Sequence, residues 1–103
     1  MASGSANYHE PVDELTDRTR DLHRAIVTLI EELEAIDWYQ QRIDSCKDEQ
    51  LRKIFAHNIN EEKEHASMSL EWIRRQDEDF SIKLSNYLFT EKSIVEEEKK
   101  TEK

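Results

Sequence analysis

The chain has very few of the residues that interrupt helices. Its 103 residues include a single glycine, Gly4, and a single proline, Pro11. Every position after residue 11 therefore lacks the two amino acids that most strongly disfavour a helix interior. A chain of this length fits one domain, which buries a smaller share of its surface than a larger domain does. We expect an all-α fold that is supported by oligomerisation.

Two further scarcities exclude whole classes of protein. Cys46 is the only cysteine, so no disulfide can form within the chain. No apolar run is long enough for a membrane-spanning helix or for the hydrophobic part of a signal peptide. We therefore expect a cytoplasmic protein with no membrane partner.

Charge is what the chain has in excess. Charged residues make up 38% of it and hydrophobic residues 36%, a balance that suits long amphipathic helices better than a large core. Its 15 basic and 24 acidic residues give a formal net charge of −9. Long-range repulsion by this charge disfavours nucleic acid as a partner and favours cations as ligands.

Apolar residues recur at helical spacing in two long stretches, which predict two long helices. The first is expected from about Pro11, which a first helical turn tolerates, to about Ile43. Ser45 and Asp48, three residues apart, resemble a capping box that opens the second helix, which is expected to end near Gln76. Such a short connection predicts that the two helices pack antiparallel.

The rest of the chain predicts a shorter helix and a tail. Phe80 and Leu84 begin an apolar helical face directly after the acidic segment 77–79. The charged run that follows Val95 is typical of a solvated or frayed tail. The predicted organisation is a flexible N-terminal segment at 1–10, a helical domain at 11–90 and a charged C-terminal tail at 91–103.

Three ionisable residues fall where the helical pattern calls for apolar ones. Glu32 shares a helical face with Leu29 and Ile36. Glu62 and His65, three residues apart, share a face of the second helix. An unpaired carboxylate is costly to bury, so a cation should meet these residues.

The spacing Glu62-x-x-His65 presents a carboxylate and an imidazole on one side of a helix. The motif is a weak signal alone, but di-iron helix bundles take one Glu from each of two helices and a Glu-x-x-His from each of the other two. With Glu32, the chain holds half of this set. The other histidines lack an acidic residue at the same spacing; they are His9, His23 and His57. A two-fold axis between two chains would complete four carboxylates and two imidazoles.

Other interpretations of these residues stay open. From the pattern alone, a solvated surface or a salt-bridge cluster with Lys63, Arg52 or Arg42 fits these three residues about as well as a metal centre does. A hemerythrin-like carrier would need more histidines, and a rubrerythrin-like peroxidase would carry both halves of the site. A non-catalytic metal-binding helical oligomer, whose acidic residues bind calcium or nothing, is the alternative function.

Six stretches of sequence carry a more specific pattern. They are HRAIV at 23–27, EELEAIDWY at 31–39, AHN at 56–58, EEKEHA at 61–66, LEWIRR at 70–75 and YLFTE at 87–91. In this order and with these gaps they resemble the encapsulated ferritin family, over about residues 9 to 91. The resemblance implies a subunit of two long antiparallel helices and a short C-terminal helix, with a ferritin-like four-helix bundle completed by dimerisation.

The resemblance also implies a function and partners. Members of this family are ferroxidases that oxidise Fe(II) to Fe(III) with oxygen at a di-iron centre shared between two subunits. Their dimers form a ring-shaped decamer, which has no mineral cavity and is enclosed in the cytoplasm by an encapsulin shell that stores the iron. Cargo proteins of this kind usually end in a short apolar targeting peptide, whereas the last residues here are charged. The encapsulin shell protein is therefore expected from the resemblance alone.

The resemblance assigns roles to individual residues. Glu32, Glu62 and His65 would be the iron ligands, and we hypothesise that Glu62 bridges the two irons. Tyr39 would be a hydrogen-bonding neighbour, although an interface aromatic fits its position as well.

A second acidic site is also implied by the resemblance. Glu31 and Glu34, three residues apart and turned away from Glu32, would attract metal outside the centre, with calcium or another divalent cation as the ligand. From the residues alone, a solvated helix face fits them better. His57, Glu61 and Glu64 are left without an assigned role.

Overall fold

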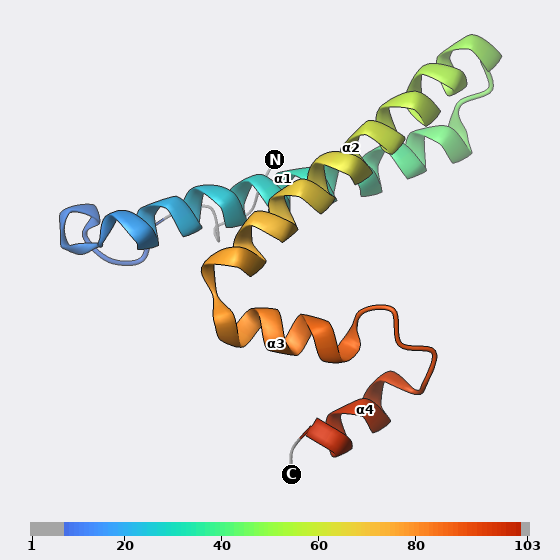
Figure 1. Ribbon diagram of the computed structural model, residues 1–103. Helices are drawn as coiled ribbons and strands as arrows, with labels where there is room; N and C mark the ends of the chain where they lie inside the picture. The colour runs from blue at the N-terminus through green and yellow to red at the C-terminus, as the bar shows by residue number, and fades with distance from the viewer. Residues whose placement is uncertain (1–7, 102–103) are drawn as a thin grey trace. The chain divides into compact units, whose positions relative to one another are not determined.

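The computed structural model describes residues 8–101, and these residues are helical throughout apart from short connections (Figure 1). In chain order the elements are η2 (Val12–Glu14), α1 (Asp17–Ser45), α2 (Glu49–Gln76), α3 (Glu78–Tyr87) and α4 (Ile94–Thr101). The predicted all-α, ferritin-like helical fold is confirmed. None of these helices combines the length and the apolar character that a membrane span requires.

The chain divides into two compact units, Met1–Ile73 and Arg74–Lys103, and the boundary falls near the end of α2. Within the first unit, α1 and α2 run in opposite directions alongside each other (Figure 1). Contacts between their side chains join Tyr39 to Asn58 and Glu32 to Ser69. The predicted antiparallel pair is therefore present.

The start of α1 differs from the prediction. Pro11 precedes the short helix η2 rather than opening the long one, and Leu15 has an extended backbone with φ −89 and ψ 144. The long helix begins only after Thr16, whose side-chain oxygen accepts a hydrogen bond of 3.1 Å from the backbone N–H of Thr19. This bond satisfies one of the amides that a helix start leaves free, so Thr16 sets the boundary.

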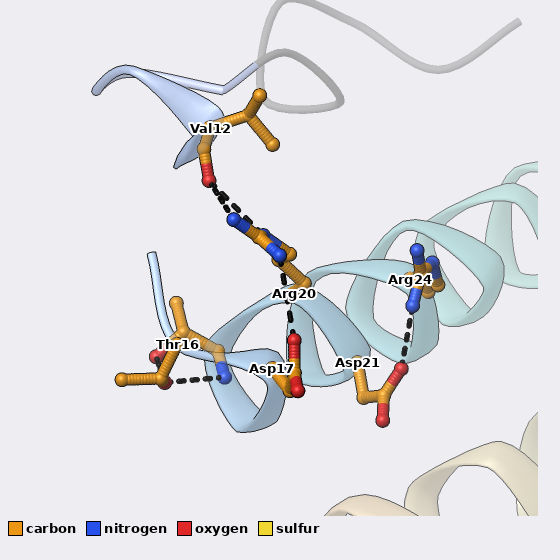
Figure 2. A network of polar contacts seen from close by, with 7 residues as sticks. Val12, Thr16, Asp17, Arg20, Asp21 and Arg24 are labelled. Carbon is orange, nitrogen blue, oxygen red and sulfur yellow. Dashed lines mark hydrogen bonds and ion pairs between the residues drawn. The ribbon is translucent and has the colours of Figure 1, made fainter. Parts of the chain in front are cut away.

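The Arg20 side chain fastens η2 to the first turns of α1 (Figure 2). The Arg20 guanidinium donates two hydrogen bonds, of 3.0 and 2.7 Å, to the carbonyl oxygen of Val12 and also pairs with Asp17 at 3.3 Å. One turn later, Arg24 pairs with Asp21 at 2.6 Å. Every carboxylate of this network is matched by a cation from the same helix.

The predicted flexible segment at 1–10 lies mostly outside the described residues. Residues 1–7 are not described, and Tyr8 stacks its ring on that of His23 with the ring centroids 4.1 Å apart. Stacking of this kind holds the first described residue against α1.

The connection between α1 and α2 spans only residues 46–48. The Asp48 side chain accepts a hydrogen bond of 2.9 Å from the backbone N–H of Leu51, so this residue caps α2. The predicted capping box is wrong in its first residue, because Ser45 is the last residue of α1. The backbone N–H of Cys46 bonds to the carbonyl of Arg42 at 2.8 Å and ends that helix.

The buried core of the described residues is thin. Only Ile59, Ala66 and Ile73, seven residues apart on one face of α2, are buried. Large apolar side chains of the first unit remain exposed; they include Ile26, Leu33, Leu51, Ile54, Met68 and Trp72. These exposed apolar side chains come from both long helices.

The second unit contains more helix than the sequence predicted. Asp77 caps α3 by accepting a hydrogen bond of 3.0 Å from the backbone N–H of Phe80. Phe89 then has φ 64 and a fully exposed side chain. The helix α4 follows at Ile94–Thr101, within the stretch predicted as a charged tail at 91–103, whose last two residues lie outside the described part.

Candidate metal centre

Glu32 of α1 meets Glu62 and His65 of α2. Each residue offers one ligand atom, and these atoms all lie within 4.8 Å of one another. Over the described part of the chain this is the one group of three or more acidic, histidine or cysteine side chains that could hold a metal ion. All three are half-buried, so they are accessible without being freely solvated.

Local sequence explains how the three side chains meet. Glu62 and His65 are three residues apart, which puts them on one face of α2. The short connection folds α1 back along α2, and this brings Glu32 opposite that face. The grouping predicted from the helical pattern is therefore present within a single chain.

Each carboxylate of the group has a polar partner, and neither partner is a lysine or an arginine. His65 Nδ1 lies 3.2 Å from Glu62 Oε1. The hydroxyl of Ser69 donates a hydrogen bond of 2.7 Å to Glu32 Oε1. Within the described residues, a metal ion that binds here would meet two carboxylates that pair with no guanidinium or ammonium group.

The cations considered for a salt-bridge cluster are used elsewhere or exposed. Arg42 lies over the ring of Tyr39, with its guanidinium carbon 5.3 Å from the ring centroid. Arg52 donates a hydrogen bond of 3.2 Å to the carbonyl of Ile43. Lys63 is exposed. These contacts weaken the salt-bridge interpretation.

Tyr39 lies on the α1 surface that faces α2. Its hydroxyl oxygen accepts a weak hydrogen bond of 3.5 Å from Asn58 Nδ2, one helical turn before Glu62. Its ring lies 6.0 Å from that of Phe55, measured between centroids. Tyr39 is thus held between α1 and α2, about two helical turns after Glu32, and its role in the centre stays a prediction.

Glu31 and Glu34 do not join the three-residue group. Glu31 is exposed, whereas Glu34 is half-buried. One carboxylate oxygen of the second residue, Oε1, is enclosed and has no hydrogen-bond partner. This carboxylate is therefore less solvated than a free helix face would make it, and the metal-attracting site stays a prediction.

His57 and Glu61 form an exposed pair one helical turn apart. His57 Nε2 lies 3.7 Å from Glu61 Oε1, and their side chains are 72% and 51% exposed. Pairs with this exposure contribute little to stability. Glu64 is exposed as well. None of these residues extends the half-buried group.

A groove of about 560 Å³ runs beside the group. Its walls come from both long helices; they are Asp21, Arg24, Ala25, Thr28, Met68, Ser69 and Trp72. Ser69 belongs both to this groove and to the contact with Glu32. Ser69 was not singled out from the sequence, because a serine leaves no periodic signal of its own.

Known proteins resemble this chain in sequence and in fold. The EncFtn-like family model matches residues 7–91. An encapsulated ferritin-like protein of Rhodospirillum rubrum is 53% identical over 95 residues, which cover 92% of this chain and 68% of that protein. A ferritin-like protein of Thermotoga maritima is 53% identical over 94 residues, which cover 91% and 82% of the two chains. The crystal structure of a Nitrosomonas europaea protein matches with a TM-score of 0.84 and 60% identity, covering 85% of this chain and 97% of that one.

Proposed function

The chain belongs to the EncFtn-like family, and from this premise we propose that it is a ferroxidase that oxidises Fe(II) to Fe(III) with oxygen. Family membership supports a ferritin-like, iron-related role. The observation that carries the finer proposal is the meeting of Glu32, Glu62 and His65 within 4.8 Å.

The donor atoms of this group fit iron. Carboxylate oxygens and an imidazole nitrogen suit iron in both its oxidation states, and no thiolate that would select a softer metal is among them. Bound iron would supply the electrons that reduce oxygen. The chain's own contribution is to hold two carboxylates and an imidazole together at a half-buried position.

The centre is proposed to be shared between two chains. One chain supplies three donors, half of the set that di-iron helix bundles use. A two-fold axis would add the same three from a second copy. The exposed apolar residues Leu51, Ile54 and Trp72 fall on α2 at spacings typical of one helix face, and a second copy would cover them.

Within this centre Glu32, Glu62 and His65 would hold the iron, and we hypothesise that Glu62 would be the ligand common to both irons. Tyr39 is proposed as a hydrogen-bonding neighbour. Glu31 and Glu34 are proposed to attract divalent cations, calcium among them, outside the centre; the enclosed oxygen of Glu34 supports this assignment.

The assembly proposed for the chain is a ring-shaped decamer of such dimers inside an encapsulin shell. The description of the Rhodospirillum rubrum relative as encapsulated supports a shell partner, with storage of the oxidised iron as its purpose. The thin buried core supports oligomerisation in general.

The test is anaerobic loading of metal-free protein with Fe(II), followed by exposure to air and measurement of the ferric absorbance over time. We expect fast oxidation by the wild type, and oxidation at the buffer rate by Glu32→Ala. Glu96→Ala, which removes an exposed carboxylate from α4, is the matched control and should oxidise iron like the wild type. If the wild type oxidises Fe(II) no faster than the buffer blank, the ferroxidase proposal is wrong and the alternative of a non-catalytic metal-binding oligomer stands.

A further inference from the structure

The hydroxyl of Ser69 makes a contact that its neighbours do not make. Ser67, on the same helix, donates its hydroxyl proton to the carbonyl of Lys63 at 2.8 Å. Thr28, across the groove on α1, likewise bonds to the carbonyl of Arg24 at 2.7 Å. Each of these two hydroxyls therefore donates to a backbone carbonyl of its own helix. The hydroxyl of Ser69 instead reaches across from α2 to α1.

The group that it reaches is a member of the candidate metal centre. Ser69 Oγ donates to Glu32 Oε1 over 2.7 Å, at a part-buried position. Ser69 lies one helical turn after His65, which in turn follows Glu62 by three residues. The contact therefore ties the carboxylate of α1 to the same face of α2 that carries the other two donors.

We propose that Ser69 is a positioning residue of the metal centre, whose hydroxyl fixes the orientation of the Glu32 carboxylate before a metal binds. The proposal rests on the metal centre put forward above. A glutamate side chain has several rotatable bonds, and ordering them costs conformational entropy. A hydrogen bond made before binding removes part of this cost from the binding step, as hydrogen bonds to ligating carboxylates generally do.

The chemistry of the contact leaves Glu32 able to act as a ligand. A carboxylate has two oxygens with about four lone-pair sites, and one hydroxyl donor occupies one of these sites. Because a hydroxyl is neutral, the carboxylate keeps its full charge for a cation. A lysine or an arginine in the same place would hold the carboxylate equally well and would compete with the metal.

Ser69 also lies in the wall of the groove that runs beside the centre. Of its neighbours there on α2, Met68 has no side-chain donor, and among the described residues no hydrogen bond joins Trp72 to Glu32. Removal of this one hydroxyl therefore leaves Glu32 without the donor that orients it.

The test measures binding of Co(II) to the full-length protein by calorimetry and by its visible absorption, with no oxidation step involved. We expect Ser69→Ala to bind Co(II) roughly 10-fold more weakly and to change the absorption bands, since loss of a hydrogen bond to a metal ligand typically costs 10- to 100-fold in affinity. Ser69→Thr keeps a hydroxyl and should restore binding to near the wild-type value. Ser67→Ala removes a hydroxyl two residues away and should bind like the wild type.

The outcomes separate this proposal from the metal centre itself. If Ser69→Ala binds Co(II) as tightly as the wild type while Glu32→Ala does not bind it, the centre stands and the role of Ser69 is wrong. If neither variant differs from the wild type, the metal centre is wrong as well. Circular dichroism checks that each variant is helical. Should Ser69→Ala fail to fold, Ser69→Thr is compared with Ser69→Val, which has nearly the same shape without the hydroxyl, and equal Co(II) affinity in these two variants would overturn the proposal.

Discussion

The start of α1 and the middle of the α1–α2 pair both contain neighbouring carboxylates. The two regions differ in the groups that contact these carboxylates. At the start of α1, Asp17 and Asp21 each pair with an arginine three residues later. In the middle of the pair, Glu32 and Glu62 are met by a hydroxyl and an imidazole. The first region supplies its own cations, whereas in the second, within the described residues, no lysine or arginine pairs with either glutamate. Carboxylates that are close together therefore do not predict a metal site until their partners are known.

The largest effect on metal binding is expected when one of the three proposed ligands is removed from the middle of the α1–α2 pair. Glu62→Ala is expected to abolish measurable Co(II) or Fe(II) binding, a larger loss than the 10- to 100-fold typical of an outer hydrogen-bond partner. Asp21→Ala, at the start of α1, should leave metal affinity within about two-fold of the wild type, because the arginine-paired carboxylate is not a ligand. Calorimetric titration of both variants checks this, and equal losses in the two would contradict the distinction.

The second prediction concerns the exposed apolar residues of α2, which are proposed to lie between two chains. Ile54→Lys puts a charge among the exposed apolar residues of α2, where the side chain is 53% exposed in the single chain. We expect it to prevent pairing of two chains, because a buried charge without a partner costs several kcal/mol. Native mass spectrometry or light scattering should then report a smaller assembly than for the wild type.

Asn60→Lys is the control for this prediction. It adds the same charge on another, exposed part of α2 and should leave the assembly unchanged. A monomeric wild type that binds two metal ions would show that the centre does not need a second chain.

A third, smaller effect is expected at the start of α1. Arg20→Ala removes two hydrogen bonds to the Val12 carbonyl and the contact with Asp17. The loss should lower the free energy of unfolding by about 1 to 2 kcal/mol, since hydrogen bonds from charged donors exceed neutral ones. Thermal unfolding checks the stability, and a parallel Co(II) titration should give wild-type affinity.

The smallest effect is expected for Arg24→Ala, one turn further on. Its pair with Asp21 is shorter, at 2.6 Å, but the two side chains are 69% and 56% exposed. Solvent screens such a pair, so the free energy of unfolding should change by no more than about 0.5 kcal/mol. A loss as large as that of Arg20→Ala would show that the ion pairs, rather than the bonds to the Val12 carbonyl, hold this region together.

Periodicity was sufficient for the fold and for the grouping of donors. Helical spacing put Glu62 and His65 on one face, and the short connection placed Glu32 opposite them. The start of α1 was harder to predict. It depends on one hydrogen bond made by Thr16, whereas Pro11 wrongly indicated an earlier start. The helix α4 was missed because its residues are mostly charged, which is also the composition of a tail.

The contact of Ser69 with Glu32 could not be predicted from the sequence. It depends on the register between α1 and α2, which hydrophobic spacing fixes only roughly, and on the rotamers of two side chains. The alternative of a salt-bridge cluster was left open for the same reason, since long cationic side chains can reach several partners. In the structure, the contacts of Arg42 and Arg52 and the exposure of Lys63 weaken this interpretation.

The position of the short connection between α1 and α2 determines which residues of the two helices lie opposite each other. Glu32 and Glu62 lie the same number of residues from Lys47, the middle residue of the connection. The two helices, which form the arms of a hairpin, therefore place these two donors at the same distance from the connection. One residue inserted into either arm would rotate a donor by about 100° around its helix and move it by about 1.5 Å along the axis. A family built on this hairpin can therefore vary many side chains along its arms, but a gain or loss of a single residue between the connection and either glutamate would separate the donors.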